Sequence, residues 1–279
     1  MVQYKIVASD LDGTLFNDRS QVSDENFRAI HTLAKHGVQF VPSSGRTLCE
    51  IPDILKNNPD IRYVIHSNGA VVVDLKTGDR ILNCLTSDLI AQVLDVIYDY
   101  DMHVMFRQNG GSFVDAACEF EGGDAYFNFI PAHRKVIDDY AKPLPRDEFQ
   151  AYAKVQNDIE VFSMFFHDDD ELEACRKRLN AIDGIGVVSV CEHNLETFCV
   201  TAGKGNALYQ LADKLGVDRA ATICVGDSEN DLSMIQAAGL GLAVANANAA
   251  LKANADAVIC SNEEHAIAYI LEHFVENQA

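Results

Sequence analysis

Two aspartates that follow an apolar strand restrict the fold of this chain more than any other feature. The apolar run Ile6-Val7-Ala8 leads almost directly into Asp10-Leu11-Asp12-Gly13-Thr14. Side chains two residues apart in an extended segment point the same way, so Asp10 and Asp12 are expected to face one small ligand. The segment therefore predicts a buried strand that turns sharply and carries acid groups at its carboxyl end.

The segments around this motif alternate between strands and helices. The apolar pattern predicts a strand at 5–9, a helix at 24–36, a strand at 38–41, a helix at 47–57 and a strand at 63–65. Ser23 can cap the first helix and Gly37 can end it. The same alternation returns after Lys204, with strands at 221–225, 241–244 and 257–260. This order predicts an α/β fold built on a doubly wound parallel sheet.

The middle of the chain has a different pattern. A hairpin is expected at 71–82, followed by an amphipathic helix, two strands around Asn109-Gly110-Gly111, a strand at 159–166 and a helix at 168–179. We therefore expect an α+β cap domain at 84–198, inserted into a discontinuous core domain formed by 1–83 and 199–279. Within the insert, the basic run 131–135 could contact an anionic substrate, but an exposed loop is the preferred interpretation.

The charge balance argues against several kinds of partner. The chain has 42 acidic and 22 basic side chains and a net charge of −20, of which −13 belongs to the insert. Such a field repels nucleic acid and anionic membrane surfaces. No apolar run approaches the roughly 20 residues that a membrane span needs, and the N-terminal residues lack the pattern of a secretory leader. We expect a cytoplasmic protein without nucleic-acid or membrane partners, and the sequence carries no signal for its oligomeric state.

The cysteines and histidines show no metal-binding pattern. The eight cysteines are scattered without C-x-x-C pairs, and the nine histidines are not clustered. Neither a zinc site nor a disulfide framework is therefore expected.

Three further polar clusters follow predicted strands or begin a predicted helix. They are the turn Ser43-Ser44-Gly45-Arg46, the cation Lys204 between two glycines, and the acidic turn Gly226-Asp227-Ser228-Glu229-Asn230-Asp231. Ligands of open parallel sheets bind outside the carboxyl ends of the strands, where these clusters would meet. Two acidic turns favour a hard divalent cation, and Mg²⁺ fits best. Hydroxyl, amide and cationic donors then suit the remaining phosphate oxygens.

Together with the first acidic turn, these clusters resemble the four motifs of the haloacid dehalogenase superfamily. Their order, and the insert between the second and third motifs, resemble its Cof-type sugar-phosphate phosphatase branch, which carries a large α+β cap. Ser67-Asn68-Gly69-Ala70 matches a turn of that branch. The second motif departs from the usual Ala-Thr-Gly-Arg, because Ser43 and Ser44 replace its first two residues. Serine keeps the hydroxyl, so the phosphate contact is expected to survive.

The resemblance implies a mechanism and a set of roles. Asp10 would attack phosphorus to form an aspartyl-phosphate, and Asp12 would act as general acid and base. Mg²⁺ would be held by the Asp10 carboxylate, the Asp12 backbone carbonyl and Asp227. The transferring phosphoryl group would be stabilised by the side chains of Ser44, Lys204 and Asn230 and by the backbone N–H groups of Leu11 and Gly45.

Four residues of these turns have open roles. Arg46 is a candidate substrate contact or a structural salt-bridge partner, and Asn68 is a candidate substrate contact or a stabiliser of its turn. We expect Asp231 to orient Lys204 or to cap the following helix in preference to ligating metal. Glu229 could be exposed to solvent.

The predicted function is a Mg²⁺-dependent phosphatase acting on small phosphorylated metabolites, sugar phosphates in particular. A phosphomutase or phosphotransferase would use the same intermediate. A dehalogenase fits less well because its attack on carbon does not require Asp12. A non-enzymatic metabolite sensor would be marked by loss of an essential acid, and all three of Asp10, Asp12 and Asp227 are present.

Overall fold

The computed structural model describes residues 3–129, 131–189 and 191–276. These form two compact units. The core unit comprises Met1–Arg46, Ile51–Ile81 and Gly203–Ala279, and the cap unit comprises Thr47–Glu50 and Leu82–Ala202. The α/β class with a parallel sheet and an additional α+β cap, expected from the sequence, is confirmed.

A five-stranded parallel sheet forms the centre of the core unit. Its strand order is β14-β13-β12-β1-β2, and the sequence order of the strands reverses direction beside β1. A parallel bridge between Ser43 and Ile65 joins β2 to β3, which belongs to a small three-stranded sheet of β3, β4 and β5. The strands are β1 (Ile6–Ser9), β2 (Gln39–Pro42), β3 (Tyr63–His66), β4 (Val71–Asp74), β5 (Arg80–Leu82), β12 (Thr222–Gly226), β13 (Leu240–Ala243) and β14 (Ala257–Val258).

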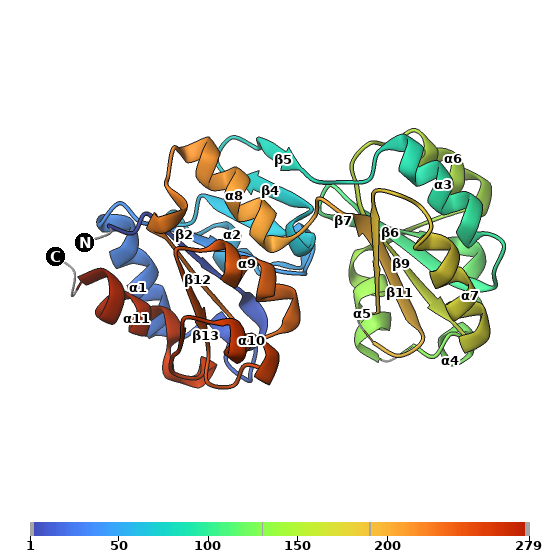
Figure 1. The fold of residues 1–279 in the computed structure, drawn as a ribbon. Coiled ribbons are helices and arrows are strands. Elements are labelled where there is room, and N and C mark those ends of the chain that lie inside the picture. The colour runs from blue at the N-terminus through green and yellow to red at the C-terminus, as the bar shows by residue number, and fades with distance from the viewer. Residues whose placement is uncertain (1–2, 130, 190, 277–279) are drawn as a thin grey trace. The chain divides into compact units, whose positions relative to one another are not determined.

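Helices cover both faces of this parallel sheet. Figure 1 shows α1 and α11 on one side of it and α8 and α9 on the other. The Ser23 hydroxyl accepts a hydrogen bond from the backbone N–H of Asn26, which caps α1 as expected. The helices of the core unit are α1 (Asp24–Lys35), α2 (Asp53–Lys56), α8 (Lys204–Leu215), α9 (Leu232–Ala237), α10 (Ala249–Asn254) and α11 (Ala266–Ile270).

The predicted helix at 47–57 is wrong. The structure has instead a short 3₁₀ turn at Leu48–Glu50 and the four-residue helix α2. Pro52 lacks a backbone N–H and disfavours the helical conformation of the residue before it, so one continuous helix cannot form. The interruption leaves Thr47–Glu50 packed within the cap unit, directly after Arg46.

The cap unit is built on a six-stranded sheet of order β10-β11-β9-β6-β7-β8, antiparallel except for β7 and β8. The helices α3, α6 and α7 cover one face over a large apolar cluster that includes Phe106, Phe162 and Phe166. Its strands are β6 (Met102–Gln108), β7 (Gly111–Asp115), β8 (Ala141–Leu144), β9 (Ile159–Phe166), β10 (Ile185–Val188) and β11 (Asn194–Cys199). Its helices are α3 (Ser87–Ile97), α4 (Gly123–Tyr126), α5 (Pro131–Tyr140), α6 (Arg146–Lys154) and α7 (Asp169–Leu179).

The basic run 131–135 does not form the exposed loop expected from the sequence. It begins helix α5, and Pro131 stands at the first helical position, where a missing N–H costs no hydrogen bond. Arg134 forms ion pairs with Glu119, Asp124 and Asp138. The side chains of 131–133 lie outside the described residues.

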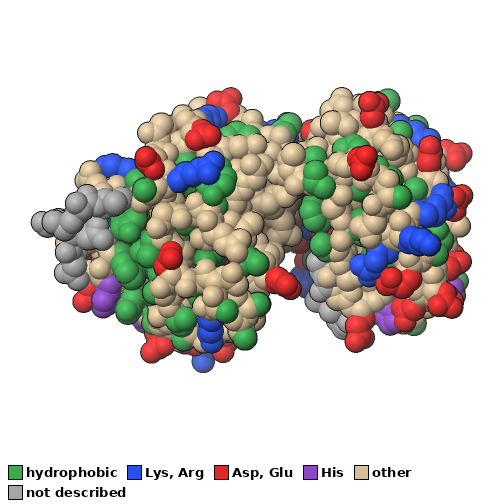
Figure 2. All heavy atoms as spheres, in the orientation of Figure 1, with side chains coloured by type: hydrophobic (Ala, Val, Ile, Leu, Met, Phe, Trp, Pro, Cys, Tyr) green, Lys and Arg blue, Asp and Glu red, His purple; other side chains and the backbone are tan. Residues whose placement is uncertain are grey.

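Acidic and basic side chains are interspersed over the cap surface that Figure 2 presents. Within the described residues, no helix has both the length and the apolar character required to cross a membrane.

Candidate active site

The carboxyl ends of three neighbouring parallel strands bring the sequence motifs together. Asp10 follows β1, the turn at Ser44 follows β2, and Asp227 follows β12. An open cavity of about 510 Å³ lies where these turns meet in the core unit. It is lined by Asp10, Asp12, Gly13, Ser44, Gly45, Arg46, Asp227, Ser228 and Asn230.

A buried cation lies between two buried carboxylates beneath this cavity. The Lys204 ammonium donates to Asp10 Oδ1 and to Asp231 Oδ1, each at 2.6 Å. The side chains of Lys204 and Asp231 are fully buried, and that of Asp10 is 7% exposed. Asp231 Oδ2 in turn accepts from the backbone N–H of Asp227 at 3.0 Å. A single network therefore joins the turns after β1 and β12 to the first residue of α8.

The electrostatics of this network follow from its burial. Burial raises the pKa of Asp10 to about 7, against the opposing charge of Lys204. Burial alone would lower the pKa of Lys204, but the charges of Asp10 and Asp231 outweigh it and raise that pKa above its ordinary value. Burial also raises the pKa of Asp227, with the charge of Asp231 acting in the same direction. Lys204 is thus a fixed positive charge.

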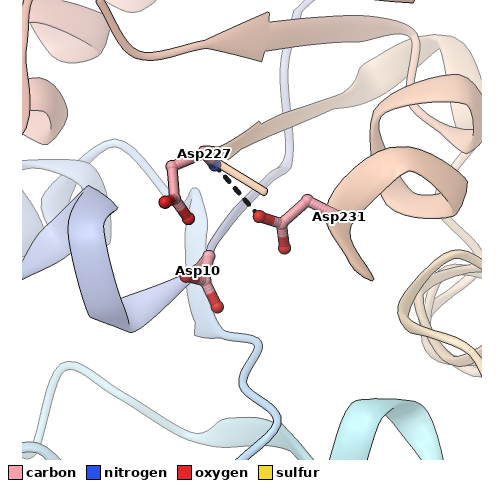
Figure 3. A group of neighbouring side chains, drawn as sticks. All are labelled: Asp10, Asp227 and Asp231. Atoms are coloured by element: carbon pink, nitrogen blue, oxygen red, sulfur yellow. Dashed lines mark hydrogen bonds between the residues drawn. The ribbon is translucent and has the colours of Figure 1, made fainter. Parts of the chain in front are cut away.

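The same carboxylates have the chemistry of a divalent-cation site. One oxygen from each of Asp10, Asp227 and Asp231 lies within 4.8 Å of the others, and Figure 3 shows the three side chains converging. Both Asp231 oxygens are occupied by Lys204 and by backbone N–H groups. Asp227 Oδ1, by contrast, is buried and has no hydrogen-bond partner among the described residues. An orphaned carboxylate oxygen beside Asp10 fits a hard cation such as Mg²⁺.

The turn after β1 requires glycine. Gly13 has φ +73°, and a Cβ atom there would lie 2.7 Å from Asp227 Oδ2. Any side chain would therefore be strained and would push against the acidic turn after β12. Sequence reasoning missed Asn246, whose side-chain amide donates to the Gly13 carbonyl at 2.7 Å. Its position three residues after β13, another carboxyl end of the parallel sheet, is the signal that could have found it.

Asp12 and Arg46 form a two-pronged ion pair at the rim of the cavity. Arg46 Nε and Nη2 donate to the two carboxylate oxygens of Asp12, each at 2.7 Å. The guanidinium also lies 5.5 Å from the centre of the Phe16 ring. Of the two roles considered for Arg46, the salt bridge is therefore the one formed in this structure.

The remaining predicted residues are held by short-range contacts. Ser44 is buried, and its hydroxyl accepts from the backbone N–H of Arg46 at 3.1 Å. The Asn230 amide donates to Asn68 Oδ1 at 3.0 Å, and the Asn68 backbone N–H donates to the Ser44 carbonyl at 3.0 Å. Asn68 is not among the residues that line the cavity, so its substrate contact stays a prediction. Ser228, which does line it, was not singled out from the sequence.

Comparison with known proteins agrees with this geometry. A family model described as haloacid dehalogenase-like hydrolase matches residues 7–271. The phosphatase YwpJ of Bacillus subtilis is 31% identical, with the match covering 97% of this chain and 100% of that protein. The 5-amino-6-(5-phospho-D-ribitylamino)uracil phosphatase YwtE of B. subtilis is 29% identical over 98% of this chain and 99% of its own length. The solved structure of a haloacid dehalogenase-like hydrolase from B. subtilis has a TM-score of 0.77 at 28% identity, covering 97% of this chain and 99% of that chain.

These matches extend over almost the whole chain, and they coincide with the motifs that converge at the carboxyl ends of β1, β2 and β12. The chain belongs to the haloacid dehalogenase-like hydrolases, and it is an enzyme of the phosphatase type.

Proposed function

We propose that this protein is a Mg²⁺-dependent phosphatase that hydrolyses small phosphorylated metabolites, sugar phosphates in particular, through an aspartyl-phosphate. The observation that carries the proposal is the network of Asp10, Lys204 and Asp231 beside the orphaned Asp227 oxygen. It combines a buried carboxylate, a fixed positive charge and carboxylate oxygens suited to a hard cation at one cavity. Phosphoryl transfer requires these three components.

In the first chemical step, the Asp10 carboxylate attacks phosphorus. A bond forms between Asp10 oxygen and phosphorus while the bond from phosphorus to the alcohol oxygen breaks, and Asp12 supplies the proton to the departing alcohol. In the second step, water attacks phosphorus and Asp12 takes its proton. The bond to Asp10 then breaks, which releases inorganic phosphate and restores both acids.

Asp10, Asp227 and the Asp12 carbonyl would hold Mg²⁺, which when bound neutralises charge on the phosphoryl oxygens. Lys204 donates a hydrogen bond to Asp10, and its positive charge offsets negative charge at the cavity. Ser44, Asn230 and the backbone N–H groups of Leu11 and Gly45 donate hydrogen bonds to the phosphoryl group in this proposal.

The Asp12–Arg46 pair adds a requirement to this scheme. Both oxygens of Asp12 accept hydrogen bonds from the Arg46 guanidinium, an arrangement that favours the ionised carboxylate. The pair has to open before Asp12 can carry a proton to a leaving group. Arg46 is then released to face the cavity that it lines.

The substrate class and the compartment are also part of the proposal. The relative YwtE is named for a substrate with a phosphorylated ribityl chain, which supports a polyhydroxylated phosphate ester as the substrate here. The net charge of −20 disfavours polymeric anions such as nucleic acid. All eight cysteines are free thiols, which supports a reducing compartment such as the cytoplasm.

The experiment is phosphate release from a panel of phosphorylated metabolites, with and without Mg²⁺. We expect inorganic phosphate to accumulate with turnover, and activity to fall to background in excess chelator and return when Mg²⁺ is added. Undiminished activity in chelator would refute the metal assignment. Transfer of the phosphoryl group to an added sugar without accumulation of inorganic phosphate would establish a phosphotransferase instead, and binding without turnover would support a sensor.

A further inference from the structure

Asparagine side chains that the proposed reaction does not use bind the backbone of the turn after β1, residues 10–16. The Asn246 amide donates to the Gly13 carbonyl at 2.7 Å, and the Asn262 amide donates to the Phe16 carbonyl at 3.1 Å. The two contacts join positions that are 233 and 246 residues apart in the chain. The C-terminal part of the core unit therefore determines where the carbonyls of this turn lie.

The segment that carries Asn246 also binds the turn after β12. Residues 244–248 follow β13, and the Asn248 backbone N–H donates to the Asp227 carbonyl at 2.8 Å. One short segment therefore contacts both acidic turns, one through its backbone and the other through the Asn246 side chain. A carboxylate oxygen of Asp10 lies within 4.8 Å of one of Asp227, and Figure 3 shows both side chains. The separation of these carboxylates thus depends on this segment.

Asn246 is itself oriented by Asn262. The Asn262 backbone N–H donates to Asn246 Oδ1 at 3.0 Å. A backbone N–H can only donate and a carbonyl can only accept, so the Asn246 side chain has one orientation, with its oxygen toward Asn262 and its nitrogen toward Gly13. Asn262 is 6% exposed, and its amide also donates to Asp18 Oδ1 at 3.1 Å. Asn262 is therefore a buried and well-bound support for Asn246.

Asn26 of α1 binds the middle of the same turn. Its side chain is buried, and its oxygen accepts from the backbone N–H groups of Ile267 and Ala268 at 3.0 and 3.3 Å. Its amide donates to the Leu15 carbonyl at 3.4 Å, which is a longer and weaker hydrogen bond. Side-chain amides thus bind carbonyls at three positions of the turn.

The turn after β1 lacks the backbone regularity that would fix Asp12 without such contacts. Asp12 and Gly13 have non-helical backbone angles within a segment that otherwise forms a single helical turn. Asp12 directly precedes Gly13, so a change in the orientation of the Gly13 peptide would displace Asp12. A displacement of about 1 Å at a catalytic group can lower a rate by about 100-fold. The contact between Asn246 and Gly13 therefore lies where a small loss of order has a large effect on rate.

We propose that Asn246 is a positioning residue for phosphoryl transfer, which fixes the turn that carries Asp10 and Asp12 against the turn that carries Asp227. Asn262 orients Asn246 for this role, and Asn26 supports the same turn from α1. Asn246 acts through the backbone of the turn after β1 and not through a contact with substrate. This proposal rests on the proposed phosphatase function.

The first test separates turnover from substrate binding. Asn246→Asp keeps the oxygen that accepts from Asn262 but places a second oxygen against the Gly13 carbonyl, and Asn246→Ser removes the donor without adding charge. In phosphate release from p-nitrophenyl phosphate with Mg²⁺, we expect kcat to fall by about 10- to 100-fold in Asn246→Asp and by about 3- to 10-fold in Asn246→Ser. KM should stay within about threefold, because other residues make the proposed substrate contacts.

Asn254→Asp is the matched control. The Asn254 amide also donates to a backbone carbonyl, that of Ala250 at 2.9 Å within α10, so this variant loses a similar contact and gains the same charge away from the acidic turns. Its kcat should stay within about twofold of the unsubstituted value.

The melting temperature separates positioning from a purely structural role. Asn246 is exposed, so neither of its variants should melt much below the unsubstituted protein. A purely structural role would lower the melting temperature and leave the kcat of the folded protein unchanged. Unchanged kcat in both Asn246 variants, a loss in Asn246→Asp alone, a loss confined to KM, or an equal loss in Asn254→Asp would overturn the proposal.

Hydrogen exchange tests the positioning without turnover. The backbone N–H groups of Leu15 and Phe16 donate to carbonyls within the turn, so their exchange reports how well the turn is ordered. In Asn246→Ser, a peptide covering residues 11–18 should exchange about fivefold or more faster, while peptides of β9 in the cap unit stay unchanged. Unchanged exchange of the peptide covering 11–18 would overturn the proposal.

The phosphatase function fails on a different measurement, namely the absence of phosphate release by the unsubstituted enzyme with Mg²⁺ across the metabolite panel. Faster exchange in Asn246→Ser would support the ordering of the turn by Asn246 even then.

Discussion

Lys204 in the core unit and Arg107 in the cap unit are cationic side chains that differ in how completely their buried polar atoms are paired. In the core unit, Lys204 is fully buried but donates to carboxylates on two different turns. In the cap unit, the buried Nε of Arg107 and Oγ of Ser112 have no partner within the described residues. Within the part of the chain that the structure describes, the first arrangement is fully paired and the second is not.

The difference concerns the interactions that stabilise each unit. Phosphoryl transfer depends on charges that are positioned in advance, so the core unit binds them into one network. The cap unit instead gains stability from its large apolar cluster. Four changes test this comparison.

The largest effect is expected from Asp10→Asn. The carboxamide can still accept from Lys204 but cannot act as the nucleophile, so kcat should fall by at least about 10³-fold. The melting temperature should change little because the substitution introduces no cavity. Steady-state phosphate release and thermal unfolding measure the two quantities, with Asp79→Asn on the exposed turn before β5 as the control. Near-native turnover by a purified Asp10→Asn protein would contradict the assignment of Asp10 as the nucleophile.

Lys204→Met should destabilise the core unit through electrostatics. It removes the cation between Asp10 and Asp231 and leaves two buried carboxylates facing each other, at a cost of about 3–5 kcal/mol in the free energy of unfolding. Lys214→Met, at the exposed end of the same helix, should cost less than about 0.5 kcal/mol. Urea unfolding of both variants gives the comparison. Equal stability of the two would show that the network does not hold the core unit together.

Phe162→Ala should destabilise the cap unit through packing. The ring is fully buried, and its centroid lies 5.6 Å from that of the Phe106 ring. Truncation should therefore lower the free energy of unfolding by about 3–5 kcal/mol. Hydrogen exchange followed by mass spectrometry should show faster exchange in peptides of the cap unit and unchanged exchange in β1 and β12. Loss of protection throughout both units would contradict the expectation that the cap unit can be destabilised without the core unit.

The smallest effect concerns Asp74 of β4. Hydrogen bonds from Arg62 lower its pKa from 3.8 to about 2. Because the folded pKa is depressed, the stability from this contact is fully present above about pH 4 and is lost as the pH falls through about 2. Its size should not exceed about 1 kcal/mol, because Arg62 is nearly half exposed. Asp74→Asn should therefore flatten the acid limb of the stability curve slightly, as urea unfolding between pH 5 and pH 2 would show. An unchanged acid limb would show that Asp74 does not contribute to the pH dependence of stability.

The sequence predicted secondary structure best in segments whose pattern is typical of only one kind of element. Strand β9 was predicted with its observed bounds from its apolar run, and α1 was predicted with its cap at Ser23. The prediction of one helix at 47–57 was wrong because Pro52 interrupts the helix by local chemistry alone. The predicted loop at 131–135 was wrong because basic residues say little about conformation when Arg134 finds acidic partners elsewhere in the cap unit.

The sequence by itself determined the acidic turns, their order, the α/β alternation and the negative charge, because each depends on residue type and local spacing. Only the tertiary structure decided that Lys204 bridges Asp10 and Asp231, that Arg46 pairs with Asp12, and that Asn246 holds Gly13. Residues as much as 233 positions apart make these contacts. The ion pair of Arg107 and Glu196 likewise depends on strand register, since a shift of one residue would turn either side chain to the opposite face.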